Sequence, residues 1–363
     1  MGTQTEAVIA GQSGQRRVLL TNWQSPGDIV MLTAAVRDLH KAYPGKFVTD
    51  VRTSCEPLWD NNPYITRFTE PWIDKQAAIT RDAKPAVPTR RDDIMFVPCQ
   101  YPLVQRSNQY PGHFVGAFHD ELARVLRVEI PVTEFKGDIH LSDAERGWMS
   151  QIAEMGVYDR FWIINSGGKW DYTAKWPNVK VLQDVVHHYM GKVVFVQAGD
   201  KGNWQPPLSN CINVIGQTDI RQLIRLIYHS TGVITPVNGI MHLAAAVPFP
   251  HGGGTSRPCV VIAGAREPTH WEAYPTHRFL STQGALPCCN PSACWKSRCT
   301  PVGDKDGKDA DPCTNYVEYD APRCETARQQ PEKIRIPKCI DMISADDVIR
   351  AIDSYYTGGV LPK

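Results

Sequence analysis

The sequence lacks any apolar run that approaches the ~20 residues needed to cross a bilayer. It also lacks an excess of either charge, because 39 Lys and Arg stand against 38 Asp and Glu, a net charge of +1. A balance of this kind gives no indication of a nucleic-acid-binding protein or of an acidic tail. We therefore expect no transmembrane segment and no nucleic-acid partner.

Targeting signals are also missing from the first residues, MGTQTEAVIAGQSGQRR. Their short, weakly apolar patch precedes the basic pair, which is the reverse of the order in a signal peptide. The position that carries Ser or Thr in a myristoylation signal is Glu6. These features predict a cytoplasmic location.

Two phosphate-binding signatures, the Walker sequence and the G-x-G-x-x-G fingerprint, are absent as well. What the sequence does have is material for a packed core. Hydrophobic residues make up 42% of the chain and charged residues 21%, which is typical of a folded globular protein. At ~150 residues per domain, the length predicts two domains.

Strands and helices are expected to alternate in the first part of the chain. Residues 17–20 read as a strand, residues 21–28 as a loop, and residues 29–43 carry apolar positions at helical spacing. Further short strands are expected at 47–51 and 94–97. Strand, loop, helix and strand in this order are typical of a parallel α/β sheet.

A second α/β series is expected to begin near residue 158, after a break near 145–158. Its expected strands and helices are 161–165, 181–189, 193–197, 212–215, 220–229, 232–234, 242–247 and 259–263. The tail differs, because it is rich in Pro, Gly, Asp, Lys and Cys and has no clear periodicity. The predicted organisation is therefore a first domain over 1–150, a second over 158–284, a cysteine-rich segment over 285–340 and a C-terminal helix within 341–363.

Four polar loops follow predicted strands, where open α/β sheets bind ligands. Gly27-Asp28 offers a carboxylate that can act as a general base, or that simply caps the next helix. Ser166-Gly167-Gly168-Lys169, with Lys175 nearby, offers backbone amides and cations suited to a diphosphate. An ordinary strand-to-helix turn with surface lysines is the structural alternative.

The third loop is Asn238-Gly239-Ile240-Met241-His242, which opens a helix. Its amides, with Asn238 and His242, suit phosphate or sugar hydroxyls. The alternative is a helix start in which Asn238 is the cap and His242 packs inside. The loop 266–274 is dense in polar and aromatic groups, and it can either stack a sugar and pair a phosphate or anchor itself in the core.

Cysteines are clustered, since seven of the eleven lie between Cys288 and Cys339. In a reducing compartment such a cluster indicates a metal site. Four thiolates can form a tetrahedral Zn or Fe site, and the ligands we predict are Cys289, Cys294, Cys313 and Cys339. Cys288 competes with Cys289 in this set, Cys299 and Cys324 remain spare, and free thiols or disulfides formed after lysis are the alternative.

Several segments together resemble glycosyltransferase family 9, the ADP-heptose heptosyltransferases. The resemblance runs along most of the chain, and G-I-M-H-L-A-A-A is its most specific piece. The segments that carry it are 25–39 (SPGDIVMLTAAVRDL), 62–65 (NPYI), 216–223 (GQTDIRQL) and 239–246 (GIMHLAAA).

The cysteine-bearing tail is similar to that of one subset, the bacterial autotransporter heptosyltransferases. The similar segments are 286–289 (LPCC), 294–298 (CWKSR) and 337–343 (PKCIDMI). The resemblance implies a cysteine-bound structural iron, a homo-oligomeric ring, and serines of adhesin proteins as acceptors.

The family resemblance implies an α/β GT-B fold, with two Rossmann-like domains facing a cleft and the metal-binding insertion near the C-terminus. It implies inverting transfer of a heptose or related sugar from an ADP-sugar to a hydroxyl of a protein Ser or Thr or of a lipopolysaccharide core. Asp28 then matches the catalytic base, and no catalytic divalent metal is expected. The implied donor-binding residues are Gly167, Gly168, Lys169, Thr173, Lys175, Thr218, Asn238, Gly239 and His242.

One departure from the family pattern bears on the donor. Typical members have an acidic residue followed by Ser or Thr before the Gly of G-x-x-H, and here these positions are Val237 and Asn238. The change leaves open a donor sugar other than heptose. It also leaves open a second hypothesis, a non-catalytic transferase fold that acts as a binding or assembly module.

Overall fold

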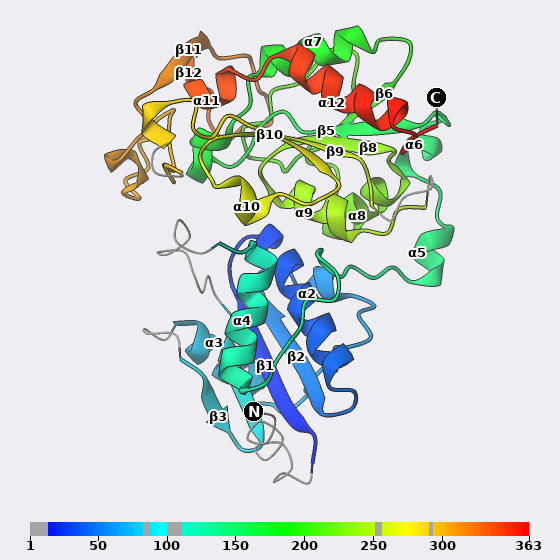
Figure 1. The fold of residues 1–363 in the computed structure, drawn as a ribbon, viewed down its shortest axis with the longest axis vertical. Coiled ribbons are helices and arrows are strands. Elements are labelled where there is room, and N and C mark those ends of the chain that lie inside the picture. The colour runs from blue at the N-terminus through cyan, green and yellow to red at the C-terminus, as the bar shows by residue number, and fades with distance from the viewer. Residues whose placement is uncertain (1–13, 83–86, 100–110, 251–255, 290–292, 363) are drawn as a thin grey trace. The chain divides into compact units, whose positions relative to one another are not determined.

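The chain folds into two compact units, Met1–Asp143 and Ala144–Lys363, which are considered one at a time (Figure 1). The computed structural model describes residues 14–82, 87–99, 111–250, 256–289 and 293–362. None of the helices in these ranges combines the length and the apolar character needed to cross a bilayer.

The first unit is built on a four-stranded sheet of order β2-β1-β4-β3. β1 is parallel to β2 and β4, and β3 is antiparallel to β4. Helix α3 packs on β1 and β4, while α2 packs against α4. Its elements are β1 (Arg16–Asn22), α2 (Pro26–Ala42), β2 (Phe47–Thr53), the 3-10 helix η1 (Glu56–Trp59), α3 (Ile73–Asp82), β3 (Thr89–Arg91), β4 (Ile94–Pro98) and α4 (Phe114–Leu126).

The second unit is built on a six-stranded, all-parallel sheet of order β10-β9-β8-β5-β6-β7. Figure 1 shows α7 and α12 over one face of this sheet and α8 and α9 over the other. The elements of its α/β part are α5 (Asp143–Gly147), α6 (Gln151–Glu154), β5 (Phe161–Ile164), the 3-10 helix η3 (Trp170–Lys175), α7 (Val179–His188), β6 (Val194–Gln197), β7 (Ile212–Asn213), α8 (Ile220–His229), β8 (Gly232–Pro236), α9 (Gly239–Ala246), β9 (Cys259–Gly264), α10 (Thr269–Glu272) and β10 (His277–Ser281).

The cysteine-rich segment folds onto the core of the second unit. It contains an antiparallel hairpin, β11–β12, which the sequence analysis did not predict. Buried residues of this segment share one hydrophobic cluster with α7, α12 and the sheet. Its elements and the C-terminal helices are η4 (Pro287–Cys289), η5 (Lys308–Ala310), β11 (Tyr316–Asp320), β12 (Lys333–Pro337), α11 (Lys338–Asp341) and α12 (Ala345–Thr357).

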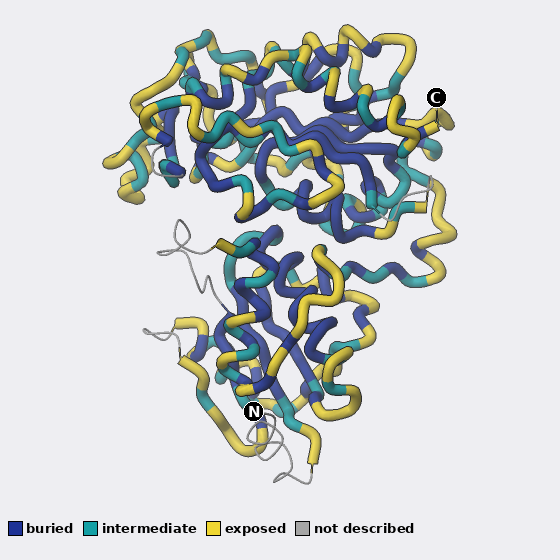
Figure 2. Tube along the Cα trace, viewed as in Figure 1, coloured by how far each residue is buried: buried dark blue, intermediate teal, exposed yellow. Residues whose placement is uncertain are grey.

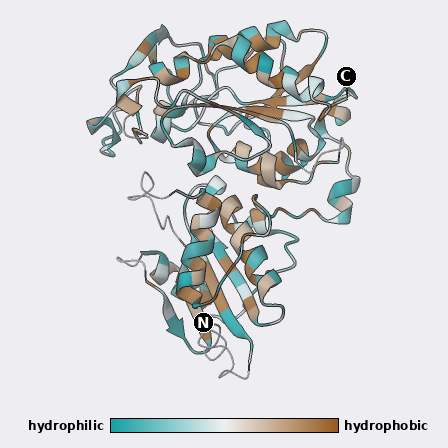
Figure 3. Cartoon of the chain, in the orientation of Figure 1, coloured by the Kyte–Doolittle hydropathy of each residue, from teal (hydrophilic) through white to brown (hydrophobic). Residues whose placement is uncertain are grey.

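Burial follows the layers of each unit. Figure 2 shows the interior strands of both sheets as buried and the outward faces of the helices as exposed. In the second unit the interior strands are also among the most hydrophobic segments (Figure 3). Strands that are covered on both faces read as continuous apolar runs, as Phe161–Ile164 does. The predicted parallel α/β architecture is confirmed.

The division between the units falls at Asp143 and Ala144, whereas the sequence analysis ended the first domain at 150. Polar contacts with α8 explain the difference. The Arg221 guanidinium pairs with the Glu145 carboxylate at 2.5 Å, and the Gln151 side chain donates to the Gln222 carbonyl at 2.7 Å. Residues that connect the two sheets are therefore held by the second unit.

Gly167 has a packing role that its sequence neighbours did not reveal. Its α-carbon lies against the Trp204 carbonyl, and a Cβ built at this position would stand 1.7 Å from that oxygen. Gly168 pairs with Trp204 through backbone hydrogen bonds of 2.9 and 3.1 Å. The Trp204 ring in turn stacks on Trp176 and meets Trp170 edge-on. Close backbone approach at Gly167 therefore anchors a tryptophan cluster.

We predict that Gly167→Ala lowers the free energy of unfolding by about 1–3 kcal/mol, because the new methyl group forces a backbone shift. Gly168→Ala is the matched control, since the nearest atom to a Cβ there is a Trp176 side-chain carbon at 3.6 Å. Urea denaturation of the two variants measures the difference. Equal losses of stability would contradict the packing role of Gly167.

Candidate functional site

The six-stranded sheet of the second unit has a topological switch point between β5 and β8. From β5 the chain proceeds to β6 and β7 on one side, and β8, β9 and β10 then fill the other side. The loops that leave β5 and β8 therefore diverge at the carboxyl edge of the sheet. Ligands of open α/β sheets bind in the crevice that such a divergence creates.

Two asparagines bridge this switch point. The Asn238 side-chain amide donates to the Asn165 side-chain oxygen at 3.1 Å. Asn165 is 1% exposed, and its own amide donates to the Ala198 carbonyl at 2.7 Å and to the Gln205 side chain at 3.1 Å. Asn165 thus joins the ends of β5, β6 and β8 in one buried network.

Asn238 is also the N-cap of α9, as one of the sequence interpretations expected. Its side-chain oxygen accepts from the Ile240 backbone N–H at 2.9 Å and from the Thr235 hydroxyl at 3.0 Å. The amide group carries two N–H donors. Within the described residues only one of them has a partner, Asn165, so the half-buried Asn238 keeps one donor for a ligand.

The other two candidates on α9 and its loop differ in exposure. Gly239 is the first residue of the helix and is half-buried. His242 is 4% exposed, and its Nδ1 lies 2.8 Å from the Tyr274 hydroxyl. Its Nε2 lies 3.7 Å from the Glu272 carboxylate. This geometry matches the interpretation in which His242 packs inside.

Thr173 and Lys175, on η3, are occupied by contacts within the unit. Thr173 is fully buried, and its hydroxyl donates to the Thr300 carbonyl at 2.8 Å and accepts from the Cys299 N–H at 2.9 Å. The Lys175 ammonium pairs with the Glu267 carboxylate at 2.5 Å. These two side chains therefore connect η3 to the cysteine-rich segment and to the loop after β9.

Lys169 and Thr218 complete the predicted donor set. Lys169 is exposed and lies directly before η3, on the loop that leaves β5. Thr218 is half-buried and precedes Asp219, which forms a capping box at the start of α8 with Gln222. Both positions follow strands of the sheet, so both lie on its carboxyl side.

The loop 266–274 anchors itself in the core. Trp271 is fully buried, which matches the anchor interpretation. The Arg266 guanidinium pairs with Glu267 and donates to the Lys296 carbonyl at 2.5 Å. The pKa of Glu267 is lowered, because the favourable charges of Lys175 and Arg266 outweigh its burial. Arg266 is thus committed to the protein and not presented to a phosphate.

Asp28 lies at the corresponding edge of the first unit, where β1 passes into α2. It is 7% exposed, and one carboxylate oxygen accepts from the Ser25 N–H at 3.0 Å in a capping box. Asp28 is thus not the N-cap that the capping interpretation expected: Ser25 is the N-cap, α2 begins at Pro26, and Asp28 is the N3 residue of the capping box. The strand order places β1 between β2 and β4, so Asp28 lies at the switch point of the smaller sheet.

The same edge of the first unit carries buried polar atoms that lack partners. Native proteins pair nearly all such atoms, so a group of them indicates a missing ligand or water. All of these residues lie at the ends of β1 and β2 or in the segments that follow. Within the described part of the chain they are Thr21, Asn22, Trp23, Gln24, Thr53, Trp59 and Asn62.

Four polar residues in the first part of the chain, Arg106, Ser107, Asn108 and His113, are candidates for contact with an acceptor. Arg106, Ser107 and Asn108 lie outside the described residues. His113 is the N-cap of α4, and its Nδ1 accepts from the Val115 N–H at 3.0 Å. Its ring packs on Phe135 with centroids 4.4 Å apart.

The four cysteines predicted as ligands line one small cavity of about 10 Å³ in the second unit. Cys288, the competing residue, lines it as well. The spare residue Cys324 does not; its thiol lies 3.7 Å from the Thr326 hydroxyl. The cavity is lined by Cys288, Cys289, Cys294, Cys313 and Cys339, together with residues that include Arg266, Lys296 and Asn315.

No three sulfurs of the described cysteines lie as close together as the ligands of one metal ion would. All eleven cysteines of the chain are free thiols. Among the described residues, three ligand atoms lie within 4.8 Å of one another only in an exposed carboxylate group formed by Asp171, Asp304 and Asp306. A four-cysteine metal site is therefore not formed among the described residues, although these cysteines line one cavity.

The exposed carboxylate group has cations of its own. The fully buried Arg298 guanidinium binds Asp304 at 2.8 Å and Asp306 at 2.9 Å. Its hydrogen bond holds the pKa of Asp304 well below its usual range. Lys308 lies 3.6 Å from the third carboxylate, Asp171. Arginine and lysine thus supply the positive charge that these carboxylates require.

Two residues that shape the site, Asn165 and Gln205, were not predicted from the sequence. Asn165 did carry a signal, because it is a polar residue at the end of an apolar strand. Gln205 carried none, because its partner Asn165 is far away in the sequence. Glu267 belongs to the polar loop 266–274, but its pairing with Lys175 could not be predicted.

Comparisons with known structures show several with the same fold. A family 9 glycosyltransferase from Veillonella parvula DSM 2008 is 14% identical, with a TM-score of 0.57 over 93% of this chain and 96% of that one. ADP-heptose lipopolysaccharide heptosyltransferase II of E. coli is 13% identical, with a TM-score of 0.56 over 93% and 98%. The predicted GT-B glycosyltransferase fold is thereby confirmed.

A third similar structure is the iron-containing dodecameric glycosyltransferase TibC from enterotoxigenic E. coli H10407. It is 14% identical, with a TM-score of 0.56 over 95% of this chain and 77% of that one. The same protein has also been solved in complex with ADP-D-beta-D-heptose.

Sequence comparison agrees with the fold. No curated protein matches the chain. The family model "Glycosyltransferase family 9 (heptosyltransferase)" matches residues 106–288, just over half of the chain. That segment contains the switch point, both asparagines that bridge it, and helix α9. The chain is therefore a glycosyltransferase and belongs to glycosyltransferase family 9, the heptosyltransferases.

Proposed function

We propose that this enzyme transfers a heptose from ADP-heptose to a hydroxyl acceptor with inversion at the anomeric carbon. The observation that carries the proposal is the Asn165–Asn238 bridge, because it forms a preorganised polar site at the switch point of the second unit. Family membership and the complex of TibC with ADP-D-beta-D-heptose support the identity of the donor.

In the proposed mechanism the diphosphate leaves as negative charge develops on it. The amino end of α9 presents backbone N–H groups and the positive end of its dipole, with the remaining amide N–H of Asn238 beside them. Lys169, on the loop after β5, supplies a cation. We assign Gly239 and Thr218 to donor binding by position, and Gly167, Gly168, Thr173 and Lys175 to shaping the loop after β5.

Asp28 is the proposed general base. Its carboxylate lies at the end of β1, where an acceptor hydroxyl can lose its proton to it as the new glycosidic bond forms. Both oxygens of an ionised carboxylate accept hydrogen bonds, so the capping bond from Ser25 does not prevent this role. The neighbouring unpaired polar atoms support a hydroxyl-rich acceptor, and we propose a protein Ser or Thr or a sugar of a lipopolysaccharide core.

We also propose that the cysteine cavity holds one structural metal ion. Thiolates suit both zinc and iron, and the iron content of TibC favours iron. The residues that would hold it are Cys289, Cys294, Cys313 and Cys339, with Cys288 as the alternative to Cys289. Bound there, the ion stabilises the fold of the segment and takes no part in sugar transfer.

The proposal extends to the location and the oligomeric state of the enzyme. Eleven free thiols fit a reducing compartment, so we place the enzyme in the cytoplasm. The dodecameric state of TibC supports a homo-oligomer for this chain as well.

The test of the base separates catalysis from capping. Asp28→Asn keeps an oxygen for the capping bond but removes the base, so we expect kcat to fall about 10²–10⁴-fold while thermal stability and donor affinity stay unchanged. Ser25→Ala is the matched control: it weakens the cap by about 1 kcal/mol but leaves the carboxylate, so transfer persists. Undiminished transfer by Asp28→Asn would refute the assignment.

The test of the metal is elemental analysis of anaerobically purified protein. We expect about one iron or zinc ion per chain in the wild type, a near-complete loss in Cys294→Ser/Cys313→Ser, and a lower melting temperature of that variant. Cys324→Ser is the control, because this cysteine belongs to the same segment but does not line the cavity. A metal-free wild type, or equal loss in the control, would contradict the proposal.

A further inference from the structure

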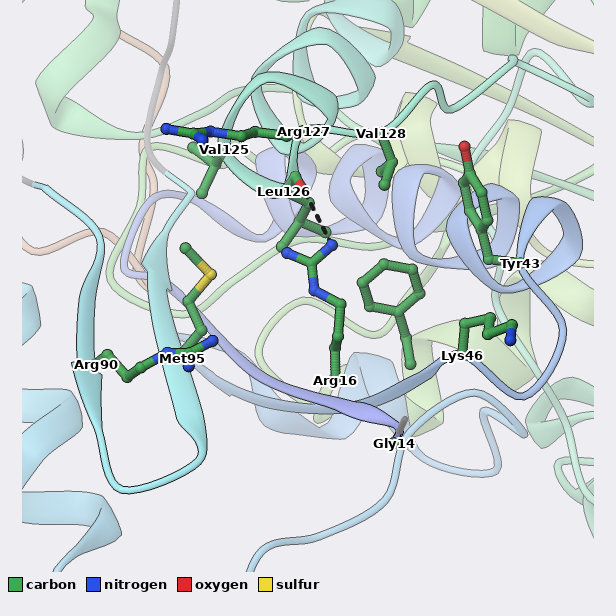
Figure 4. A pocket seen from close by; sticks show the side chains of 11 residues that line it. Gly14, Arg16, Tyr43, Lys46, Arg90, Met95, Val125, Leu126, Arg127 and Val128 are labelled. Atoms are coloured by element: carbon green, nitrogen blue, oxygen red, sulfur yellow. Dashed lines mark hydrogen bonds between the residues drawn. The ribbon is translucent and has the colours of Figure 1, made fainter. Parts of the chain in front are cut away.

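A second cavity, of about 270 Å³, lies at the amino end of the sheet in the first unit. Its lining comes from the start of β1, the turn after α2, the β3–β4 hairpin and the end of α4 (Figure 4). β1 begins at Arg16 here and ends at Asn22 on the edge that carries Asp28. At about 3.3 Å per residue, the strand places some 20 Å between this cavity and the proposed acceptor edge.

The charged residues that line this cavity all have one sign. Arg16, Lys46, Arg90 and Arg127 line it, and its lining contains no Asp or Glu. Within the described residues, none of these four cations forms an ion pair. Burial lowers the pKa of Arg16, and repulsion from Arg90 adds to the effect. Cations that have no anion beside them repel each other. A bound anion would reduce this repulsion.

The floor of the cavity is apolar. Phe47 and Leu126 are buried, and Met95 is half-buried. The Arg16 guanidinium lies over the Phe47 ring, 5.1 Å from its centroid, and donates to the Leu126 carbonyl at 3.0 Å. Arg16 is thus fixed by the protein, while the exposed side chains of Lys46, Arg90 and Arg127 stand around it (Figure 4).

We propose that this cavity binds a phosphate monoester whose phosphate is joined to a small apolar group. A phosphate dianion offers three acceptor oxygens and up to two negative charges, which suits several arginines better than a single carboxylate does. Phe47 and Met95 then contact the apolar group. A site of this kind is separate from donor and acceptor binding, because it lies at the opposite edge of the sheet.

The experiment uses the full-length protein and two probes, phenyl phosphate and vesicles of phosphatidylcholine containing phosphatidic acid. The test variant is Arg90→Gln/Arg127→Gln, in which both replaced side chains are exposed and the fold is retained. The matched control is Arg91→Gln/Arg124→Gln, which removes equal charge from the same two regions. Its side chains lie over Trp72 and against Glu121, outside the cavity.

We expect the test variant to weaken phenyl phosphate binding roughly tenfold or more, as measured by calorimetry at low salt, and the control to leave it unchanged. The same dependence in vesicle co-sedimentation but not with phenyl phosphate would support the site and identify a lipid headgroup as its source. Binding of neither probe to the wild type, or equal losses in both variants, would overturn the proposal.

Discussion

The hydrogen bond between Asn165 and Asn238 is the interaction on which the proposed donor site depends. It joins the loops after β5 and β8, which diverge because of the strand order. Both side chains are positioned by the ends of these strands. The side-chain N–H groups of Asn165 are already bound, to the Ala198 carbonyl and to the Gln205 side chain. The two loops at the switch point are therefore held together before any ligand arrives, which reduces the cost of ordering them on binding.

The cysteine-rich segment is connected through η3 to the loop after β5. Thr173 hydrogen-bonds to the segment on both sides of Cys299, and Lys175 pairs with Glu267 beside Arg266, whose guanidinium binds the Lys296 carbonyl. A metal bound by the thiols would thus stabilise the loop after β5 through these contacts. The proposed structural metal would in this way affect donor binding without taking part in the chemistry.

Much of the α/β framework could be predicted from the sequence, because its strands are short apolar runs and its helices carry clear caps. Asn238 caps α9 as one interpretation expected, and Ser344 forms a capping box at the start of the predicted C-terminal helix. The β11–β12 hairpin was missed although Lys333–Pro337 alternates polar and apolar residues, since surrounding Pro and Lys residues hid that pattern. The packing role of Gly167 could not be predicted from the sequence. Glycine is needed there because the Trp204 carbonyl lies against it, and this contact forms only in the folded chain.

The most direct measurement is a calorimetric titration of the purified protein with ADP-heptose and with ADP. If the switch point of the second unit is the donor site, both bind with roughly micromolar affinity, and the heptose conjugate binds at least as tightly as ADP. Failure of both ligands to bind folded, metal-loaded protein would contradict the assignment of this crevice to the donor.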